Sequence, residues 1–357
     1  MIDYLIHAWK TIFVEKKVPW RLQRIYSFVR INNFRLLFVP LRFKFFKPSM
    51  RIVLSTTFCG GVGGTEKLVK AVIESMPDCE FLVYADDVKA RGFIPKTWNF
   101  RLNVSAKPNT SYDVYLYFCG GGKPKYLGDN YTFKTKIVDT NASTIFDIED
   151  LFDVILVQAQ DYSRWCTQHS KCVVAFPEIQ GTIPKRLIPI NDLPQNYILT
   201  VFNPFVSAQK NPELLIEMTS RSKLPVVWCY SDITGSFPVE FFSNATNLLA
   251  LKNLPQEQLY YVYKHAKAFV SLSTYESFGW ALAEAFFMGL PIISRRTGII
   301  PFVDKQPGIS VYTDENELLA VLDECDFPSP SYDRSVFLTH TYRAAFENAL
   351  LAVSESC

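Results

Sequence analysis

The sequence lacks the features that mark membrane-spanning, secreted and zinc-binding proteins. It has no run of about 18 apolar residues, so we predict no transmembrane helix. Residues 1–20 show neither the uninterrupted apolar run nor the small-residue cleavage site of a secretory signal. The four histidines lie far apart in the chain, so we expect neither a zinc site nor a histidine-based catalytic triad.

Cysteine and glycine motifs are also incomplete. The eight cysteines are scattered without a CxxC pair, which is typical of buried or free thiols in a reducing compartment. We therefore predict a cytoplasmic protein. The glycine-rich loop at 58–67 (FCGGVGGTEK) has no Gly-Lys-Ser/Thr and lacks the last glycine of GxGxxG. This argues against a Walker A loop and against a nicotinamide-dependent dehydrogenase.

The composition indicates a globular protein with an unevenly distributed charge. Hydrophobic residues make up 48% of the 357 residues, enough for a substantial core in two domains. The net charge is +2, but residues 1–50 hold ten Lys and Arg against two acids. The remaining chain holds 27 Lys and Arg against 33 acids. An anionic partner is therefore expected to meet the N-terminal segment.

That basic segment is also rich in Trp and Phe, a combination that suits a helix lying on an anionic membrane. We predict that residues 1–47 make this contact, which would place the protein on the cytoplasmic face of a membrane. The alternative is a helical segment packed on the protein's own surface with its Lys and Arg side chains extended into water. No nucleic-acid partner is expected, because no reading motif accompanies the charge.

One stretch, 271–303, organises the rest of the chain. A strand over 268–272, a loop, a helix over 280–288 and a strand from 291 form one βαβ unit. Gly289 is expected to end the helix in the left-handed conformation.

The chemistry of this unit lies at the start of its helix. Gly279 would let a ligand approach the backbone, and the free N–H groups of Phe278, Gly279 and Trp280 would suit a phosphate. Glu276 and Glu284 flank these groups, and carboxylates accept hydrogen bonds from the paired hydroxyls of a sugar. A nucleotide sugar would therefore find a partner for each of its parts.

This pattern resembles the Glu-x7-Glu signature of the retaining glycosyltransferases of family four, which have the GT-B fold. Glu276 and Glu284 hold its two glutamate positions. The surrounding residues in register with the family are Ser277, Phe278, Gly279, Ala285, Gly289 and Pro291. The resemblance covers roughly residues 51–311.

The resemblance implies two further parts of a donor site. Gly63 and Gly64 match the Gly-Gly loop that follows the first strand of the family. Lys210 matches a lysine that binds the donor diphosphate. The arginine that usually precedes this lysine is missing, because Asn203 or Phe205 stands in its place. Its charge would then have to come from other cations, for which the candidates are Arg295, Arg296 and Lys252.

The resemblance also implies the architecture: an α/β protein with two Rossmann-like domains facing a central cleft. We predict an N-terminal segment (1–50), an acceptor domain (51–185), a nucleotide-sugar domain (186–330) and a C-terminal part (331–357). A proline-rich linker is expected at 181–196, where periodicity is lost. The last helix, expected over 335–353, would cross back to the first domain.

The function implied is transfer of a sugar from a UDP- or GDP-linked donor to an acceptor hydroxyl, with retention of configuration. Lys210 would hold the diphosphate, Glu276 the donor sugar and Glu284 the ribose, while Ser277 and Trp280 would line the donor site. Neither a metal nor a cofactor is expected, and the acceptor would be a glycan or a lipid-linked glycan. The alternatives are a nucleotide-sugar epimerase or hydrolase of the same fold, and a non-catalytic membrane-associated scaffold.

Overall fold

The structure is a computed structural model in which the chain divides into two units, Met1–Ser49 and Met50–Cys357. It describes residues 48–59, 64–88, 100–102, 110–118, 124, 131–140, 145–158, 166–179, 183–203, 208–231 and 245–355. The predictions for residues 1–47, Gly63 and Phe205 lie outside these ranges. Among the described residues, no helix has the length and apolar character needed to cross a membrane.

The first half of the described chain forms a seven-stranded parallel sheet in the order β3-β2-β1-β4-β5-β6-β7. Its strands are β1 (Arg51–Cys59), β2 (Glu80–Val88), β3 (Phe100–Leu102), β4 (Ser111–Phe118), β5 (Thr132–Asp139), β6 (Val154–Val157) and β7 (Cys172–Val174). The central strands are apolar on both faces, as a parallel sheet covered on both sides requires. The chain order changes direction at β1 and β4, as in Rossmann-like sheets.

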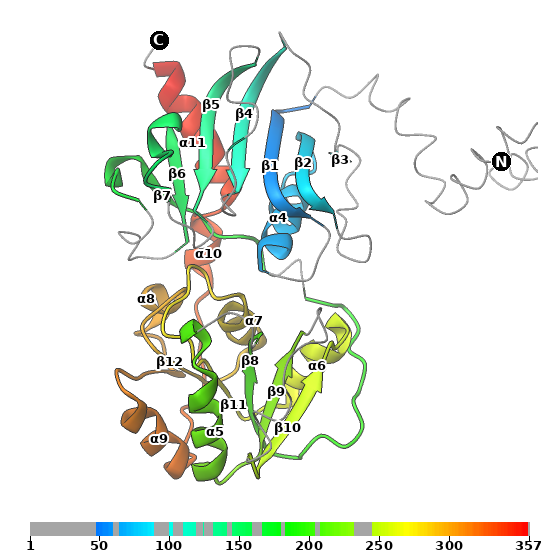
Figure 1. Ribbon diagram of the computed structural model, residues 1–357, viewed down its shortest axis with the longest axis vertical. Helices are drawn as coiled ribbons and strands as arrows, with labels where there is room; N and C mark the ends of the chain where they lie inside the picture. The colour runs from blue at the N-terminus through cyan, green and yellow to red at the C-terminus, as the bar shows by residue number, and fades with distance from the viewer. Residues whose placement is uncertain are drawn as a thin grey trace, which may run out of the picture. The chain divides into compact units, whose positions relative to one another are not determined.

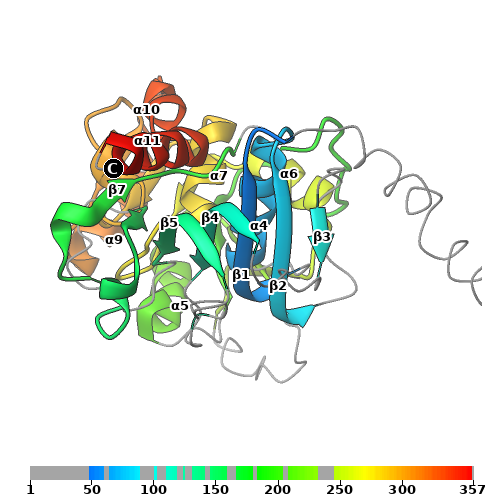
Figure 2. The ribbon, with the colours of Figure 1, turned by 90° about the horizontal axis from the view of Figure 1, so that it is seen from above.

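Two helices from distant parts of the chain cover one face of this sheet: α4 (Gly64–Ser75) and α11 (Tyr342–Glu355) (Figures 1 and 2). Leu68 and Val72 of α4 and Phe346 of α11 belong to the same buried cluster as the strand residues beneath them. The last helix therefore crosses back to the first domain, as expected. The opposite face is covered by Ile145 and Phe152, which flank the short helix η1 (Glu149–Leu151).

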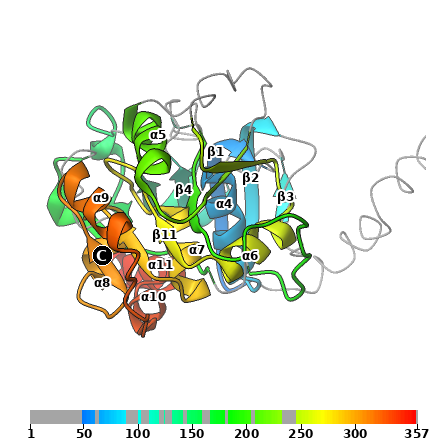
Figure 3. The same ribbon diagram turned by 90° about the horizontal axis from the view of Figure 1, so that it is seen from below.

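The second half forms a six-stranded parallel sheet in the order β10-β9-β8-β11-β12-β13. Its strands are β8 (Ile198–Val201), β9 (Val226–Tyr230), β10 (Leu248–Lys252), β11 (Ala268–Val270), β12 (Ile292–Ser294) and β13 (Ile309–Val311). Helices α5 (Pro212–Arg221) and α9 (Glu315–Glu324) pack on one face of the sheet. Helices α6 (Gln256–His265) and α7 (Trp280–Met288) pack on the other (Figure 3).

The segment between the two sheets has no helix or strand over its described residues 183–197. A second connection runs back from α10 (Ser335–Thr339) to α11. The two connections are joined, because the Phe176 N–H donates to the His340 carbonyl at 2.6 Å and Phe176 pairs with Thr341 as a parallel bridge.

This pairing explains one wrong prediction. The helix expected without interruption over 335–353 is two helices, broken at His340 and Thr341. The His340 backbone has φ −109° and ψ 49°, outside the helical region, and its carbonyl accepts from Phe176 rather than from the helix. Residues 166–168 are not helical, and a short 3-10 turn η2 (His169–Lys171) follows them.

Helix α9 (Glu315–Glu324) was not predicted from the sequence. Its start is capped by Asp314, whose carboxylate accepts hydrogen bonds from the N–H groups of Asn316 and Glu317. An aspartate immediately before an apolar-periodic segment is a usual helix-start signal, and it was available in the sequence.

Candidate donor site

The site is built around the start of α7, which follows β11 at the carboxyl edge of the second sheet. Parallel α/β sheets bind ligands at this edge. Gly279 precedes the helix with φ 75° and ψ 69°, a left-handed conformation that favours glycine. Because α7 begins at Trp280, its first N–H groups have no partner within the helix. Gly289 ends α7, also in the left-handed region (φ 74°), as predicted from the sequence.

The loop before α7 is fixed by the turn that follows β12. The Glu276 N–H donates to Thr297 Oγ1 at 2.5 Å, and the Gly298 N–H donates to the Glu276 carbonyl at 3.2 Å. Gly298 has φ +57°, and a Cβ there would lie 2.6 Å from the Phe278 carbonyl oxygen. Two backbone segments thus lie too close for any other residue at Gly298, and this holds Glu276 in place.

Lys210 is brought to the same loop by the turn η4 (Ala208–Lys210). The Thr274 N–H donates to the Gln209 carbonyl at 2.8 Å, and Gln209 Nε2 donates to the Tyr275 carbonyl at 2.7 Å. Lys210 Nζ pairs with Glu276 Oε1, and each of the two side chains is 16% exposed. Two of the predicted site residues, 66 positions apart in the sequence, are therefore in contact.

Glu284 lies two turns further along α7 and is 1% exposed. Its Oε1 accepts from Lys67 Nζ at 2.6 Å, and its Oε2 accepts from the Tyr263 hydroxyl at 3.1 Å. Burial, and then the negative charge of Glu284, raise the pKa of Tyr263 well above its ordinary value, so this hydroxyl stays protonated and donates. The buried carboxylate thus has a hydrogen-bond donor on each oxygen.

Lys67 was not among the predicted residues. It lies in the first turns of α4, on the helix that follows the glycine-rich loop, whereas Glu284 lies 217 positions further along the chain. One signal was present in the sequence, the lysine that ends the FCGGVGGTEK loop, but its spacing alone does not connect it to α7.

Trp280 contacts the same part of α4. A Cβ on Gly64 would lie 3.3 Å from Trp280 Cδ1, and Lys67 Nζ lies 5.9 Å from the centroid of the indole ring. Gly64 therefore lets the backbone of α4 approach an aromatic side chain. Two residues of α7, Trp280 and Glu284, face two residues of α4.

The remaining predicted residues either offer backbone groups to the site or bury their side chains. The Phe278 side chain is 1% exposed and packs against Phe176, with ring centroids 6.0 Å apart, so only its backbone is placed to meet a ligand. Ser277 is half-buried beside it in the loop. Asn203, one candidate for the position of the missing arginine, accepts from the Ser231 N–H at 2.9 Å through Oδ1.

Two of the cations proposed to replace that arginine are engaged elsewhere. Arg295 donates from Nη1 to the Thr313 carbonyl at 2.7 Å, and its guanidinium lies 5.1 Å from the Tyr312 ring centroid. Arg296 pairs through Nε with Asp304 at 2.8 Å. Lys210 and Lys67 are the lysines that the described structure pairs with the two site glutamates.

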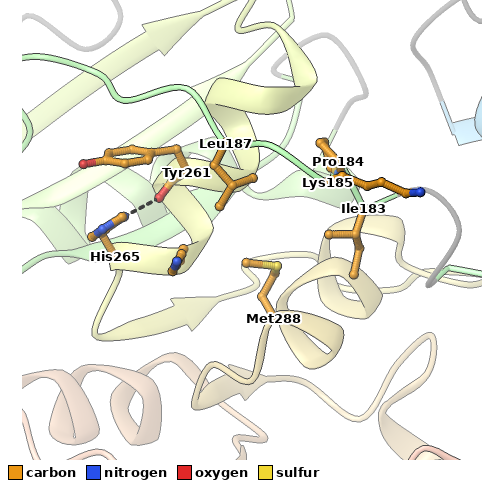
Figure 4. Close-up of a pocket in the computed structure, with 8 residues that line it drawn as sticks. Ile183, Pro184, Lys185, Leu187, Tyr261, His265 and Met288 are labelled. Carbon is orange, nitrogen blue, oxygen red and sulfur yellow. Dashed lines mark hydrogen bonds between the residues drawn. The ribbon is translucent and has the colours of Figure 1, made fainter.

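A pocket of about 630 Å³ lies at the other end of α7 (Figure 4). It is lined by Ile183, Pro184, Lys185, Leu187, Tyr261, Lys264, His265 and Met288. In Figure 4 the Lys185 side chain points away from Tyr261 and His265, so the basic groups do not converge on one point. None of the predicted site residues lines this pocket, and we do not assign the donor to it. Within the described ranges, no three His, Cys, Asp or Glu side chains are grouped to hold a metal ion.

Comparisons with known proteins bear on the second domain and on the overall fold. Residues 186–317 match the family model described as "Glycosyl transferases group 1". The chain is similar in structure to the apo form of the lipopolysaccharide outer core galactosyltransferase WaaB, with a TM-score of 0.55 and 14% identity over 86% of this chain and 100% of that one. A search of curated proteins gives no match.

Two further solved structures show the same fold. AviGT4, a glycosyltransferase involved in avilamycin A biosynthesis, has a TM-score of 0.52 and 12% identity over 85% of this chain and 96% of that one. Sucrose-phosphate synthase from Thermosynechococcus elongatus has a TM-score of 0.51 and 13% identity over 86% and 94%. The chain thus has two Rossmann-like domains in the GT-B fold, which confirms the predicted fold. The match to the family model falls within the second of these domains.

Proposed function

We propose that the protein transfers a sugar from a UDP- or GDP-linked donor to an acceptor hydroxyl, with retention of configuration. The observation that carries this proposal is the contact between Lys210 and Glu276 beside the start of α7, within the domain that matches group 1 glycosyl transferases. In this proposal, the donor diphosphate binds where Lys210 and the first N–H groups of α7 come together.

The charges at this place support departure of a diphosphate. Lys210 and the helix start put positive charge where negative charge develops on the leaving group, which lowers the barrier electrostatically. Glu276 would orient the donor sugar. A bare carboxylate so close would repel the diphosphate, and its pairing with Lys210 reduces that repulsion. Because lysine and helix supply this charge, the proposed mechanism uses no metal and no cofactor.

Glu284 would bind the ribose hydroxyls of the donor. Each of its oxygens already accepts one hydrogen bond, and a carboxylate oxygen has room for a second. The acceptor hydroxyl would attack on the face from which the diphosphate leaves and pass its proton to the departing phosphate oxygen, which gives retention. We assign no protein nucleophile and no general base.

The test is turnover with a set of UDP- and GDP-linked sugars and glycan acceptors, with NMR of the product to read the anomeric configuration. Glu276→Gln should lower kcat strongly while UDP or GDP binding, which involves no sugar, is kept. The matched control is Glu217→Gln on α5, an exposed glutamate of the same domain, which should behave as wild type. Rapid epimerisation or hydrolysis without acceptor would favour the alternative enzymes, and an absence of nucleotide-sugar binding would favour a scaffold.

The basic segment 1–47 supports a membrane-borne acceptor, such as a lipid-linked glycan, at the cytoplasmic face. Deletion of residues 1–47 should abolish flotation with anionic liposomes and leave transfer to a soluble acceptor intact. Neutral liposomes serve as the control. Unchanged flotation after the deletion would refute the membrane contact.

A further inference from the structure

Glu284 is the most deeply buried charged group of the candidate site, with 1% exposure. A carboxylate so far from water remains charged only where a cation or strong donors compensate for its lost hydration. Lys67 provides this compensation at 2.6 Å, from a side chain that is itself 19% exposed. Among the described residues, this is the one ion pair that Glu284 makes.

The surroundings of Lys67 hold its ammonium group against Glu284. The ammonium lies over Trp280, which precedes Glu284 by one helical turn, and Gly64 allows α4 to approach that indole closely. A Cβ at position 64 would lie 3.3 Å from Trp280 Cδ1, so the indole would have to shift by a few tenths of an ångström. The packing of the two helices therefore determines where the lysine charge lies.

We propose that Lys67 is a positioning residue of the donor site, which acts through Glu284 and makes the protein select ribose over 2′-deoxyribose. This inference rests on the proposed function. Lys67 donates to Oε1 and Tyr263 donates to Oε2, which fixes the carboxylate, and each oxygen can by its chemistry accept one further hydrogen bond. Two adjacent hydroxyls, as on a ribose, match two such positions, whereas a 2′-deoxyribose offers only one hydroxyl.

A purely structural ion pair between α4 and α7 is the competing explanation. In that case, loss of Lys67 would lower the melting temperature and weaken all ligands alike. A positioning role instead changes the ratio between two ligands that differ by one hydroxyl. That ratio is unaffected by a uniform loss of folded protein.

The experiment is isothermal titration calorimetry of the full chain with UDP, GDP and ADP, each beside its 2′-deoxy counterpart. For the nucleotide whose base binds, wild type should bind the ribose form more tightly than the 2′-deoxy form. Lys67→Met should weaken binding of the ribose form on the order of tenfold. The ratio of the two dissociation constants should then be close to one. Lys67→Arg keeps the charge and should restore the preference. The control is Lys70→Met, which removes a lysine of the same helix that pairs with Glu74 four residues on. This variant should keep the wild-type preference for the ribose form.

Glu284→Gln provides the second variant, because it removes the carboxylate charge that Lys67 pairs with and keeps the size of the side chain. It should lose the ribose preference, and adding Lys67→Met to it should change little. A Lys67→Met protein that is folded and keeps the wild-type ratio overturns the role of Lys67 and leaves the proposed function standing. A wild type that binds none of the three nucleotides overturns both.

Discussion

Replacement of Lys210 by alanine tests the donor site most directly. Lys210 and Glu276 are largely shielded from water, at 16% exposure each. Two unit charges about 4 Å apart at an effective dielectric constant of about 20 interact by roughly 4 kcal/mol, and solvent reduces what is measured. A hydrogen bond to a charged group contributes about 1.5–3 kcal/mol net. We therefore expect Lys210→Ala to weaken UDP or GDP binding by roughly ten- to a hundredfold.

The loss should have two parts. One is the missing attraction between the ammonium group and the diphosphate. The other is repulsion by Glu276, which Lys210→Ala leaves as an unpaired carboxylate beside the phosphates. The double variant Lys210→Ala/Glu276→Gln removes this repulsion, so it should bind the nucleoside diphosphate more tightly than Lys210→Ala alone.

The assay is isothermal titration calorimetry at low and at high salt, because screening weakens both parts. Lys223→Ala removes an exposed lysine of the same domain and should leave binding unchanged. Wild-type affinity in Lys210→Ala would refute the diphosphate assignment. Tighter binding by Lys210→Ala than by the double variant would refute the electrostatic account of Glu276.

Three further predictions concern stability. Gly298→Ala should lower the free energy of unfolding by more than Gly289→Ala. Both glycines have positive φ, which costs an L residue about 1–2 kcal/mol, but the new Cβ would lie 2.6 Å from backbone at Gly298 and meet nothing within 4 Å at Gly289. Equal losses in denaturant titrations would contradict this. Tyr342→Phe removes the hydroxyl bonded to buried Asp139 and should cost about 1–3 kcal/mol in the same assay, an unchanged midpoint being the contrary result. Burial would raise the pKa of Glu149, but hydrogen bonds from the following loop outweigh it and the pKa is lowered. The stability that Glu149 contributes is therefore present above the ordinary carboxyl pKa of about 4.3 and is lost as pH falls through the lowered value. The free energy of unfolding of Glu149→Gln should depend less steeply on acid pH than that of wild type, and parallel stability curves would refute this.

Much of the fold was predictable because its determinants are local. Strands buried on both faces appear as short apolar runs, and α7 carries both its limits in the sequence, with a glycine on either side. The loop containing Glu276 belongs to a contiguous motif, whereas Lys210 was assigned from the resemblance, and the structure brings the two side chains together.

What escaped prediction depends on partners far away in the chain. At the break, the His340 carbonyl accepts a hydrogen bond from Phe176, and the local signal is a threonine, Thr341, whose Oγ1 accepts from the Ala344 N–H, rather than a proline or glycine. Lys67 is an ordinary helical lysine until the fold places it beside Glu284. Side-chain partners of this kind follow from tertiary packing, which residue spacing does not encode.

The position of α11 at the end of the chain has a consequence for the order in which the two domains fold during synthesis. Phe346 and its neighbours on α11 complete the core of the first sheet, yet they are synthesised after the whole second domain. At 5–20 residues per second, the roughly 170 residues between β7 and α11 take about 8 to 34 seconds to translate. During that time, α4 alone covers this face of the first sheet, and the apolar residues that α11 will bury stay exposed. The second domain can therefore complete its own core before the first domain does.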